Sequence, residues 1–239
     1  MTVLPVLMFH HYKDRYAADF KYLAENGYVS KHLSELTSFF VNLDRMKPPE
    51  KTVILTFDDG LQDFYQPTFE LLSKYNLKAS ICIPTGLIPD DVTKREIEQS
   101  ECGIHMTWDE IRVLANEPLI EIIPHSVTHT RLNQFDGRDS KKALLEYEIG
   151  VSQQVLVERL GLSKRPQFFC FPGGAGWKTG EELDSEERLV IDVLREYDYQ
   201  GALRAEFNPN DKWNQYCIPR WNIDRAATIE DLLIEISEI

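Results

Sequence analysis

The chain has 239 residues, of which 43% are hydrophobic and 27% charged, the composition of an ordinary globular protein. Its formal net charge of −13 at pH 7 argues against nucleic acid or an anionic membrane surface as a partner, because both need basic patches. No segment reaches the roughly 18 to 20 continuous apolar residues that span a bilayer, so no membrane span is expected.

Short apolar runs alternate with helical stretches along nearly the whole chain. The expected strands are Val3–Phe9, Thr52–Phe57, Ala79–Pro84, Leu119–Ile123, Phe168–Phe171, Gly201–Arg204 and, as a weaker candidate, Tyr216–Ile218. The expected helices are Tyr16–Glu25, Leu33–Val41, Phe64–Tyr75, Trp108–Ala115, Lys141–Leu160, Glu186–Glu196 and a last one from Thr228. This alternation predicts an α/β fold built from βα units around a parallel sheet.

We expect one domain over residues 1–239, because the chain contains no Gly/Ser-rich or Pro-rich linker and no low-complexity block. A charged stretch, Pro89–Cys102, interrupts the alternation, and we interpret it as a surface insertion near the functional site. Thr107 and Glu110 follow with the spacing of a capping box, which predicts a helix start.

The N-terminal residues bear on the compartment. MTVLPVLMFHHY lacks the basic start and the small-residue cleavage site of a signal peptide. We therefore expect a cytoplasmic protein, with a fragment of an exported protein as the alternative. The four cysteines form no CxxC pair, which argues against a zinc ribbon or a disulfide scaffold.

Two adjacent carboxylates, Asp58 and Asp59, end the apolar run VILTF and precede Gly60. α/β folds place their ligands at the carboxyl ends of strands. The side chains of neighbouring residues diverge, so one carboxylate can bind a metal while the other faces a water. A plain strand-to-helix turn is an equally good reading of these residues alone.

Two histidines, His125 and His129, follow the strand LIEII in the block HSVTH. Imidazoles four residues apart on one helical turn can hold a single cation, although this spacing also arises by chance. The two carboxylates and the two histidines all follow predicted strands, so their side chains should lie at the same end of the parallel sheet. One carboxylate and two imidazoles leave positions for water, as in a catalytic metal site.

Three further features carry weaker signals. Pro172 and Gly173 lie in a glycine-rich turn, FPGG, that could offer backbone N–H groups to an oxyanion, although a flexible loop is the simpler reading. His10 or His11 ends the first strand, where a structural role is the more common one. Arg220, in IPRW, would need a carboxylate partner if it is buried.

Taken together, these residues resemble the polysaccharide deacetylase family, also called the NodB-homology family or carbohydrate esterase family four. The matching segments are, in family order, LPVLMFHHY, Gly27-Tyr28, LSEL, VILTFDDG, MTWDEI, HSVTH, FPGG and IPRWNID. The resemblance implies a distorted (β/α) barrel of about seven parallel strands. It also implies that Asp58 is the catalytic base and that Asp59, His125 and His129 bind one divalent metal.

The chain departs from the common family pattern at two places. Cys170 stands where the family has an arginine, and no histidine follows His129, so the late Leu-x-His acid is missing. The subgroup resembling poly-N-acetylglucosamine deacetylases takes its acid from an LMYH-type first strand and an arginine from near the C-terminus. The segments LMFH and IPRW fit that subgroup, which implies His10 as the acid and Arg220 as the partner of Asp58.

The resemblance implies a metal-dependent hydrolase that removes N-acetyl groups from an N-acetylated sugar or polysaccharide. Zinc is the expected metal, with cobalt, nickel and iron as alternatives. Two histidines and a carboxylate also describe a non-haem iron oxygenase, but the second carboxylate favours hydrolysis. Hydrolysis of another C–N bond, in a small amide or ureide, also stays open, as does an inactive sugar-binding relative. The sequence predicts no oligomeric state.

Overall fold

The computed structural model describes residues 3–43, 45–97, 101–132, 138–173, 185–205 and 214–238. Within them the strands are β1 (Val6–Phe9), β2 (Val29–Ser30), β3 (Thr52–Phe57), β4 (Ala79–Ile83), β5 (Ile120–Pro124), β6 (Phe168–Cys170), β7 (Gly201–Leu203) and β8 (Trp221–Asn222). The helices are α1 (Tyr16–Glu25), α2 (Thr37–Val41), α3 (Phe69–Lys74), α4 (Val92–Ile97), α5 (Trp108–Leu114), α6 (Arg138–Leu145), α7 (Ser152–Leu160), α8 (Ser185–Glu196) and α9 (Ile229–Ser237). The α/β class is confirmed.

The described strands pair in parallel and form two sheets. The larger has the order β5-β4-β3-β1-β8, with β2 added beside β3, and the smaller pairs β6 with β7. A parallel bridge between Leu203 and Ile218 connects β7 to the segment before β8, and β6 packs beside β5. The parallel arrangement is as predicted, while the described ladders make two sheets rather than one closed ring.

One buried cluster is shared by both sheets. It takes side chains from the same face of successive strands: Val6, Ile54, Cys82, Ile123, Phe168, Cys170 and Leu203. Leu33, Leu36, Phe39 and Phe40 belong to the same cluster and come from the 3₁₀ turn Leu33–Leu36 and from α2. The strands therefore surround an apolar interior, as a barrel-like fold requires.

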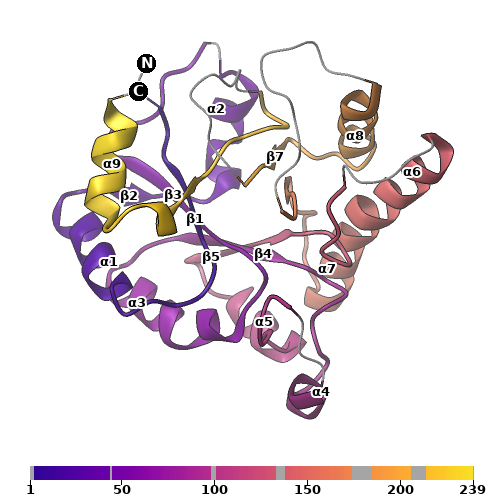
Figure 1. Cartoon of the computed structure of the whole chain (residues 1–239), viewed down its shortest axis with the longest axis horizontal. Coiled ribbons are helices and arrows are strands. Elements are labelled where there is room, and N and C mark those ends of the chain that lie inside the picture. The colour runs from indigo at the N-terminus through magenta and orange to yellow at the C-terminus, as the bar shows by residue number, and fades with distance from the viewer. Residues whose placement is uncertain are drawn as a thin grey trace.

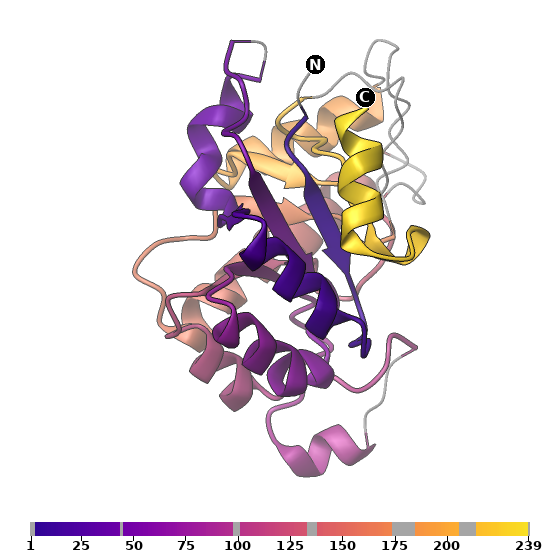
Figure 2. The ribbon, with the colours of Figure 1, turned by 90° about the vertical axis from the view of Figure 1, so that its left-hand side faces the viewer.

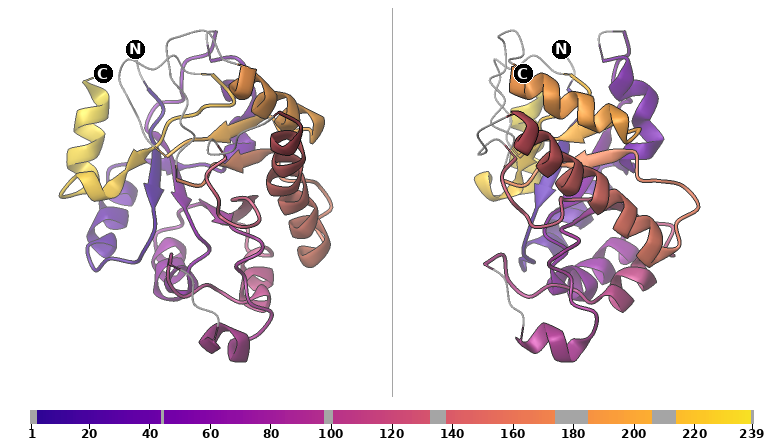
Figure 3. Two further views of the ribbon diagram at one scale, coloured as in Figure 1. Left: turned by 45° about the vertical axis from the view of Figure 1, so that its right-hand side comes forward. Right: turned by 90° about the vertical axis from the view of Figure 1, so that its right-hand side faces the viewer.

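The opposite faces of the strands pack against helices. Leu7, Phe9, Leu55 and Phe57 share a second cluster with Phe20 of α1. Figures 1 and 2 show α1 and α9 on the side of β1, and Figure 3 shows α6 and α8 together beside the β6–β7 pair. Because both faces are covered, these strands are continuous apolar runs rather than alternating ones.

Several predicted boundaries match and some differ. β3 and α1 have the predicted bounds, and Thr107 and Glu110 form the predicted capping box at the start of α5. The stretch 89–102, interpreted as an insertion, contains α4. Residues Tyr216–Ile218 make only an isolated bridge, and the last strand is β8, three residues after Ile218.

No helix among the described residues is long and apolar enough to cross a membrane.

Candidate metal centre and catalytic site

Asp58 and Asp59 follow β3 directly, and the backbone turns sharply between them. Alternation along β3 carries Ile54, Thr56 and Asp58 on the inner face of the sheet, so Asp58 is buried, with 4% exposure. Asp59 takes a left-handed backbone conformation with φ +69°, and Gly60 continues it with φ +59°. A left-handed aspartate is uncommon, and such strain concentrates at functional sites. The turn sends the two carboxylates in different directions.

Arg220 forms a buried ion pair with Asp58. Its Nη1 and Nη2 donate to Oδ1 and Oδ2 of Asp58 at 2.6 and 2.7 Å, and the arginine is 0% exposed. Nη1 also donates to Thr56 Oγ1 at 3.1 Å, and Nε donates to the carbonyl of Arg204 at 2.9 Å. Arg220 immediately precedes β8, which pairs with β1. Its side chain reaches a carboxylate that is 162 residues away in the sequence.

The electrostatics of Asp58 follow from this pair. Burial alone raises the pKa of Asp58, but the charges of Arg220 and His125 and the hydrogen bonds from Arg220 outweigh it. The pKa of Asp58 therefore lies below its ordinary value, and the group is ionised at neutral pH. The same pairing raises the pKa of Arg220 in spite of burial, so both partners carry their charges.

Asp59 faces the two predicted histidines. Its Oδ1 lies 3.0 Å from His129 Nε2 and 3.5 Å from His125 Nε2. This buried oxygen has no hydrogen-bond partner among the described residues. An orphaned carboxylate oxygen facing two imidazole nitrogens is the donor set that a divalent transition metal takes, so the residues fit such an ion.

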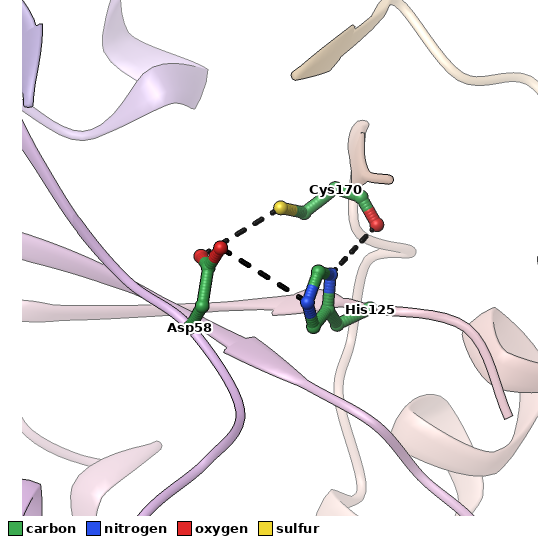
Figure 4. A group of neighbouring side chains, drawn as sticks. All are labelled: Asp58, His125 and Cys170. Atoms are coloured by element: carbon green, nitrogen blue, oxygen red, sulfur yellow. Dashed lines mark hydrogen bonds and ion pairs between the residues drawn. The ribbon is translucent and has the colours of Figure 1, made fainter. Parts of the chain in front are cut away.

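The outer nitrogen of each imidazole has a neighbour. His125 Nδ1 lies 2.9 Å from the carbonyl oxygen of Cys170 and donates to it (Figure 4). Metal-binding histidines commonly donate their second N–H to such a group, which in the neutral ring leaves the Nε2 lone pair for an ion. His129 Nδ1 lies 3.6 Å from Cys102 Sγ. Both Nε2 atoms lie on the Asp59 side of their rings.

Asp58 is a less suitable ligand than Asp59. Among the described residues, potential ligand atoms lie within 4.8 Å of one another in two groups: Asp59, Cys102 and His129, and Asp58, His125 and Cys170 (Figure 4). However, both oxygens of Asp58 accept hydrogen bonds from Arg220, and the Cys170 thiol donates to Oδ1 at 3.7 Å. Asp58, whose two oxygens accept hydrogen bonds from Arg220, therefore suits the role of a base better than that of a ligand. Asp59, with an oxygen that lacks a hydrogen-bond partner, suits the role of a ligand.

His10 and His11 point to different surroundings, as alternation along β1 predicts. His10 Nε2 lies 4.0 Å from Asp58 Oδ2, and its side chain is 34% exposed. His11 Nδ1 lies 3.1 Å from Asp63 Oδ2 on the surface. Of the two, His10 faces the site.

The glycine-rich turn after β6 is described only in part. Gly173 has φ +60°, and a Cβ there would lie 2.6 Å from Nε of Arg131, so only glycine suits the position. The following residues, 174–184, lie outside the described ranges. The oxyanion role of Pro172 and Gly173 stays a prediction.

Two contacts at the site were not predicted. His105, between the insertion and α5, is buried, and its Nδ1 lies 2.7 Å from the carbonyl oxygen of Asp59. Burial lowers the pKa of His105, which favours the neutral ring that donates to this carbonyl. Cys102, at the end of the insertion, contacts His129. Nothing in the local pattern around His105 and Cys102 signals these contacts.

The comparisons with known proteins place the chain in a family. The family model described as polysaccharide deacetylase matches residues 45–202. The poly-β-1,6-N-acetyl-D-glucosamine N-deacetylase of Escherichia coli K12 is 30% identical over 111 residues, which is 45% of this chain and 16% of that protein. YxkH of Bacillus subtilis strain 168 is 32% identical over 155 residues, which is 58% of this chain and 50% of YxkH. The chain belongs to the polysaccharide deacetylase family.

Solved structures show the same fold at low sequence identity. The Streptococcus pyogenes deacetylase PplD, in complex with acetate, has a TM-score of 0.73 at 19% identity, with 99% of both chains covered. IcaB from Ammonifex degensii has a TM-score of 0.69 at 19% identity, with 92% of this chain and 91% of IcaB covered. The fold extends over nearly the whole chain.

Proposed function

We propose that the chain is a metal-dependent hydrolase that removes N-acetyl groups from an N-acetylated sugar or polysaccharide. The observation that carries the proposal is that two adjacent carboxylates have different surroundings. Asp58 is buried and held ionised by Arg220, while Asp59 offers an orphaned oxygen beside His125 and His129. Family membership favours hydrolysis over the oxygenase alternative.

Asp59, His125 and His129 would hold the metal. With an ion held there, the site would gain the Lewis acidity that polarises an acyl carbonyl and makes a water more acidic. The donor set of two imidazoles and one carboxylate suits zinc, and cobalt, nickel and iron remain alternatives.

Asp58 would accept the proton of the attacking water. A base must be ionised, and the Arg220 pair keeps the pKa of Asp58 low although burial alone raises it. The two hydrogen bonds from Arg220 also fix the carboxylate plane, so the free lone pairs point in a defined direction. This arrangement supports the proposal that proton acceptance and metal binding belong to different carboxylates.

His10 would donate a proton to the leaving amine. An amine leaves poorly as an anion, so amide cleavage needs an acid on the leaving-group side. His10 Nε2 lies 4.0 Å from Asp58 Oδ2, and the ring is partly exposed. The reaction then balances: water supplies hydroxyl to the acetyl carbon, Asp58 takes a proton, His10 gives one, and acetate and an amine leave.

The test is acetate release from a panel of N-acetylated sugars, from monosaccharide to β-1,6-linked oligomer, with a small amide as the contrasting substrate. Activity should disappear with a chelator and return with Zn²⁺. His125→Ala and His129→Ala proteins should lose the bound ion in metal analysis, while His32→Ala, a change outside the site, should keep it. Metal retention in both site variants would refute the ligand assignment. Release from the small amide alone would refute the carbohydrate substrate.

A further inference from the structure

The loop that carries His125 and His129 is held by a buried carboxylate from another part of the chain. Glu148 is 1% exposed, and its Oε2 accepts the backbone N–H groups of Val127 and Thr128, both at 2.9 Å. Its Oε1 accepts the Thr128 hydroxyl at 2.7 Å. One side chain therefore fixes the two residues immediately before His129.

The loop needs such support because its backbone is strained. Ser126 and His129 both take left-handed conformations, with φ +66° and +61°. Successive N–H groups around such residues turn inward and form a concave anion site. Here the anion is the Glu148 carboxylate, and the remaining N–H, that of His129, donates to Ser126 Oγ at 3.0 Å.

The segment that presents Glu148 is itself anchored. It is π-helical, Glu146–Val151, a conformation found more often at functional sites than elsewhere. Tyr199 and Ser152 both donate to the carbonyl of Ile149, at 3.1 and 2.9 Å. A Cβ on Gly150 would lie 2.1 Å from the Tyr197 ring, so glycine is required for this close packing.

We propose that Glu148 is a positioning residue of the metal centre, which sets the separation and direction of the His125 and His129 imidazoles by holding the loop between them. It touches neither ligand ring and acts through the backbone of Val127 and Thr128. The inference rests on the metal site of the proposed function, but not on the substrate or on hydrolysis. We expect a folded protein that lacks the Glu148 carboxylate to hold its metal ligands in a less convergent arrangement.

Glu121 provides a matched control. It also accepts two backbone N–H groups, from Leu33 and Ser34 at 2.9 and 3.1 Å, and one hydroxyl, from Ser80 at 2.7 Å. Its contacts are made at the opposite end of β5 from His125. Removing Glu121 therefore takes away the same kinds of hydrogen bond, from a half-buried carboxylate rather than a fully buried one, without touching the loop between the histidines.

The experiment measures the dissociation constant for Zn²⁺ by competition with a chromophoric chelator, together with the melting temperature of the metal-free protein. We expect Glu148→Ala to raise the constant by about 10- to 100-fold, the usual scale for groups that orient metal ligands. Glu121→Ala should lower the melting temperature while changing the constant by less than about twofold, since distant sites act independently. An unchanged constant in Glu148→Ala would overturn the proposal.

Two further variants separate hydrogen bonding from folding. Glu148→Gln keeps an oxygen for both backbone N–H groups, and its amide can donate to Thr128 Oγ1, which has Thr130 Oγ1 at 2.8 Å as a second partner. It should bind Zn²⁺ within about threefold of wild type, and binding as weak as that of Glu148→Ala would overturn the proposal. If Glu148→Ala does not fold, Glu148→Asp decides, because its carboxylate is one methylene short of the two backbone N–H groups: weaker binding supports the proposal, and an unchanged constant overturns it.

These outcomes are independent of the proposed activity. A wild-type protein that binds Zn²⁺ but releases no acetate would refute the deacetylase function and leave the role of Glu148 open to the same measurement. Wild-type hydrolysis combined with an unchanged Zn²⁺ constant in Glu148→Ala would refute only the role of Glu148.

Discussion

Replacing Arg220 by methionine should destabilise the protein in a pH-dependent way. The guanidinium is fully buried and bidentate on Asp58, so its removal leaves a buried carboxylate without a cation. Breaking a buried pair in this way costs about 3–5 kcal/mol. Methionine fills most of the volume, which keeps the cavity contribution small.

The pH dependence follows from the pKa of Asp58. In the wild type it lies below the unfolded value of about 3.9, so the pair stabilises the fold above that pH and the contribution is lost as pH falls through the lowered folded pKa. In Arg220→Met, burial is no longer opposed by the arginine and the folded pKa rises above about 3.9. Each unit of that rise costs about 1.4 kcal/mol at pH 7, and the cost disappears below the unfolded pKa.

Urea unfolding at pH 7 and at pH 4.5 measures both effects. The stability difference between wild type and Arg220→Met should be about 3 kcal/mol or more at pH 7 and smaller at pH 4.5. Arg195→Met is the control, because Arg195 forms an exposed pair with Asp192 at 3.8 Å and surface pairs contribute about 0–1 kcal/mol. A difference at pH 7 no larger than that of the control, or one that does not change with pH, would refute this account of the pair.

Three further experiments test the proposed site. Asp58→Asn should retain Zn²⁺ in metal analysis but lose acetate release by roughly 10²-fold or more; loss of the ion would mean that Asp58 is a ligand. His10→Ala should impair hydrolysis of an N-acetyl sugar while largely sparing an acetate ester with a good leaving group, and His11→Ala should spare both; equal damage to both substrates would indicate that His10 positions rather than protonates. Cys102 is the one partly exposed thiol of the four cysteines and lies 3.6 Å from His129 Nδ1, so iodoacetamide should modify it faster without Zn²⁺ than with it in mass spectrometry; equal rates would separate Cys102 from the metal site.

The fold could be predicted from the sequence where burial dominates. β3 is apolar on both faces because it is covered on both sides, so its run Thr52–Phe57 has clear ends. The two-residue strands β2 and β8 carry too few residues for any periodic signal. Helix α4 lies in a charged stretch that shows no apolar face. These elements are set by tertiary contacts.

The same distinction holds for the site. Asp59, His125 and His129 could be brought together by reasoning alone, since each follows a strand and parallel strands end on one rim. His105 and Glu148 could not, because each acts on the backbone of a distant turn. Arg220, which holds Asp58, could be predicted because it lies in a recognisable segment, IPRW, whereas the segments around His105 and Glu148 carry no such pattern.

Cys170 stands where the common family pattern has an arginine, and this difference has a structural consequence. The guanidinium that keeps Asp58 ionised comes instead from Arg220, in the segment between the bridge at Ile218 and β8. That segment pairs with β7 through the bridge between Leu203 and Ile218, and it continues into β8, which pairs with β1. Arg220 Nε also donates to the carbonyl of Arg204, the residue after β7. The ion pair of the proposed base is therefore also a contact that connects the two sheets. In this chain, loss of Arg220 should both loosen the arrangement of the strands and raise the pKa of Asp58, so we expect activity and stability to fall together.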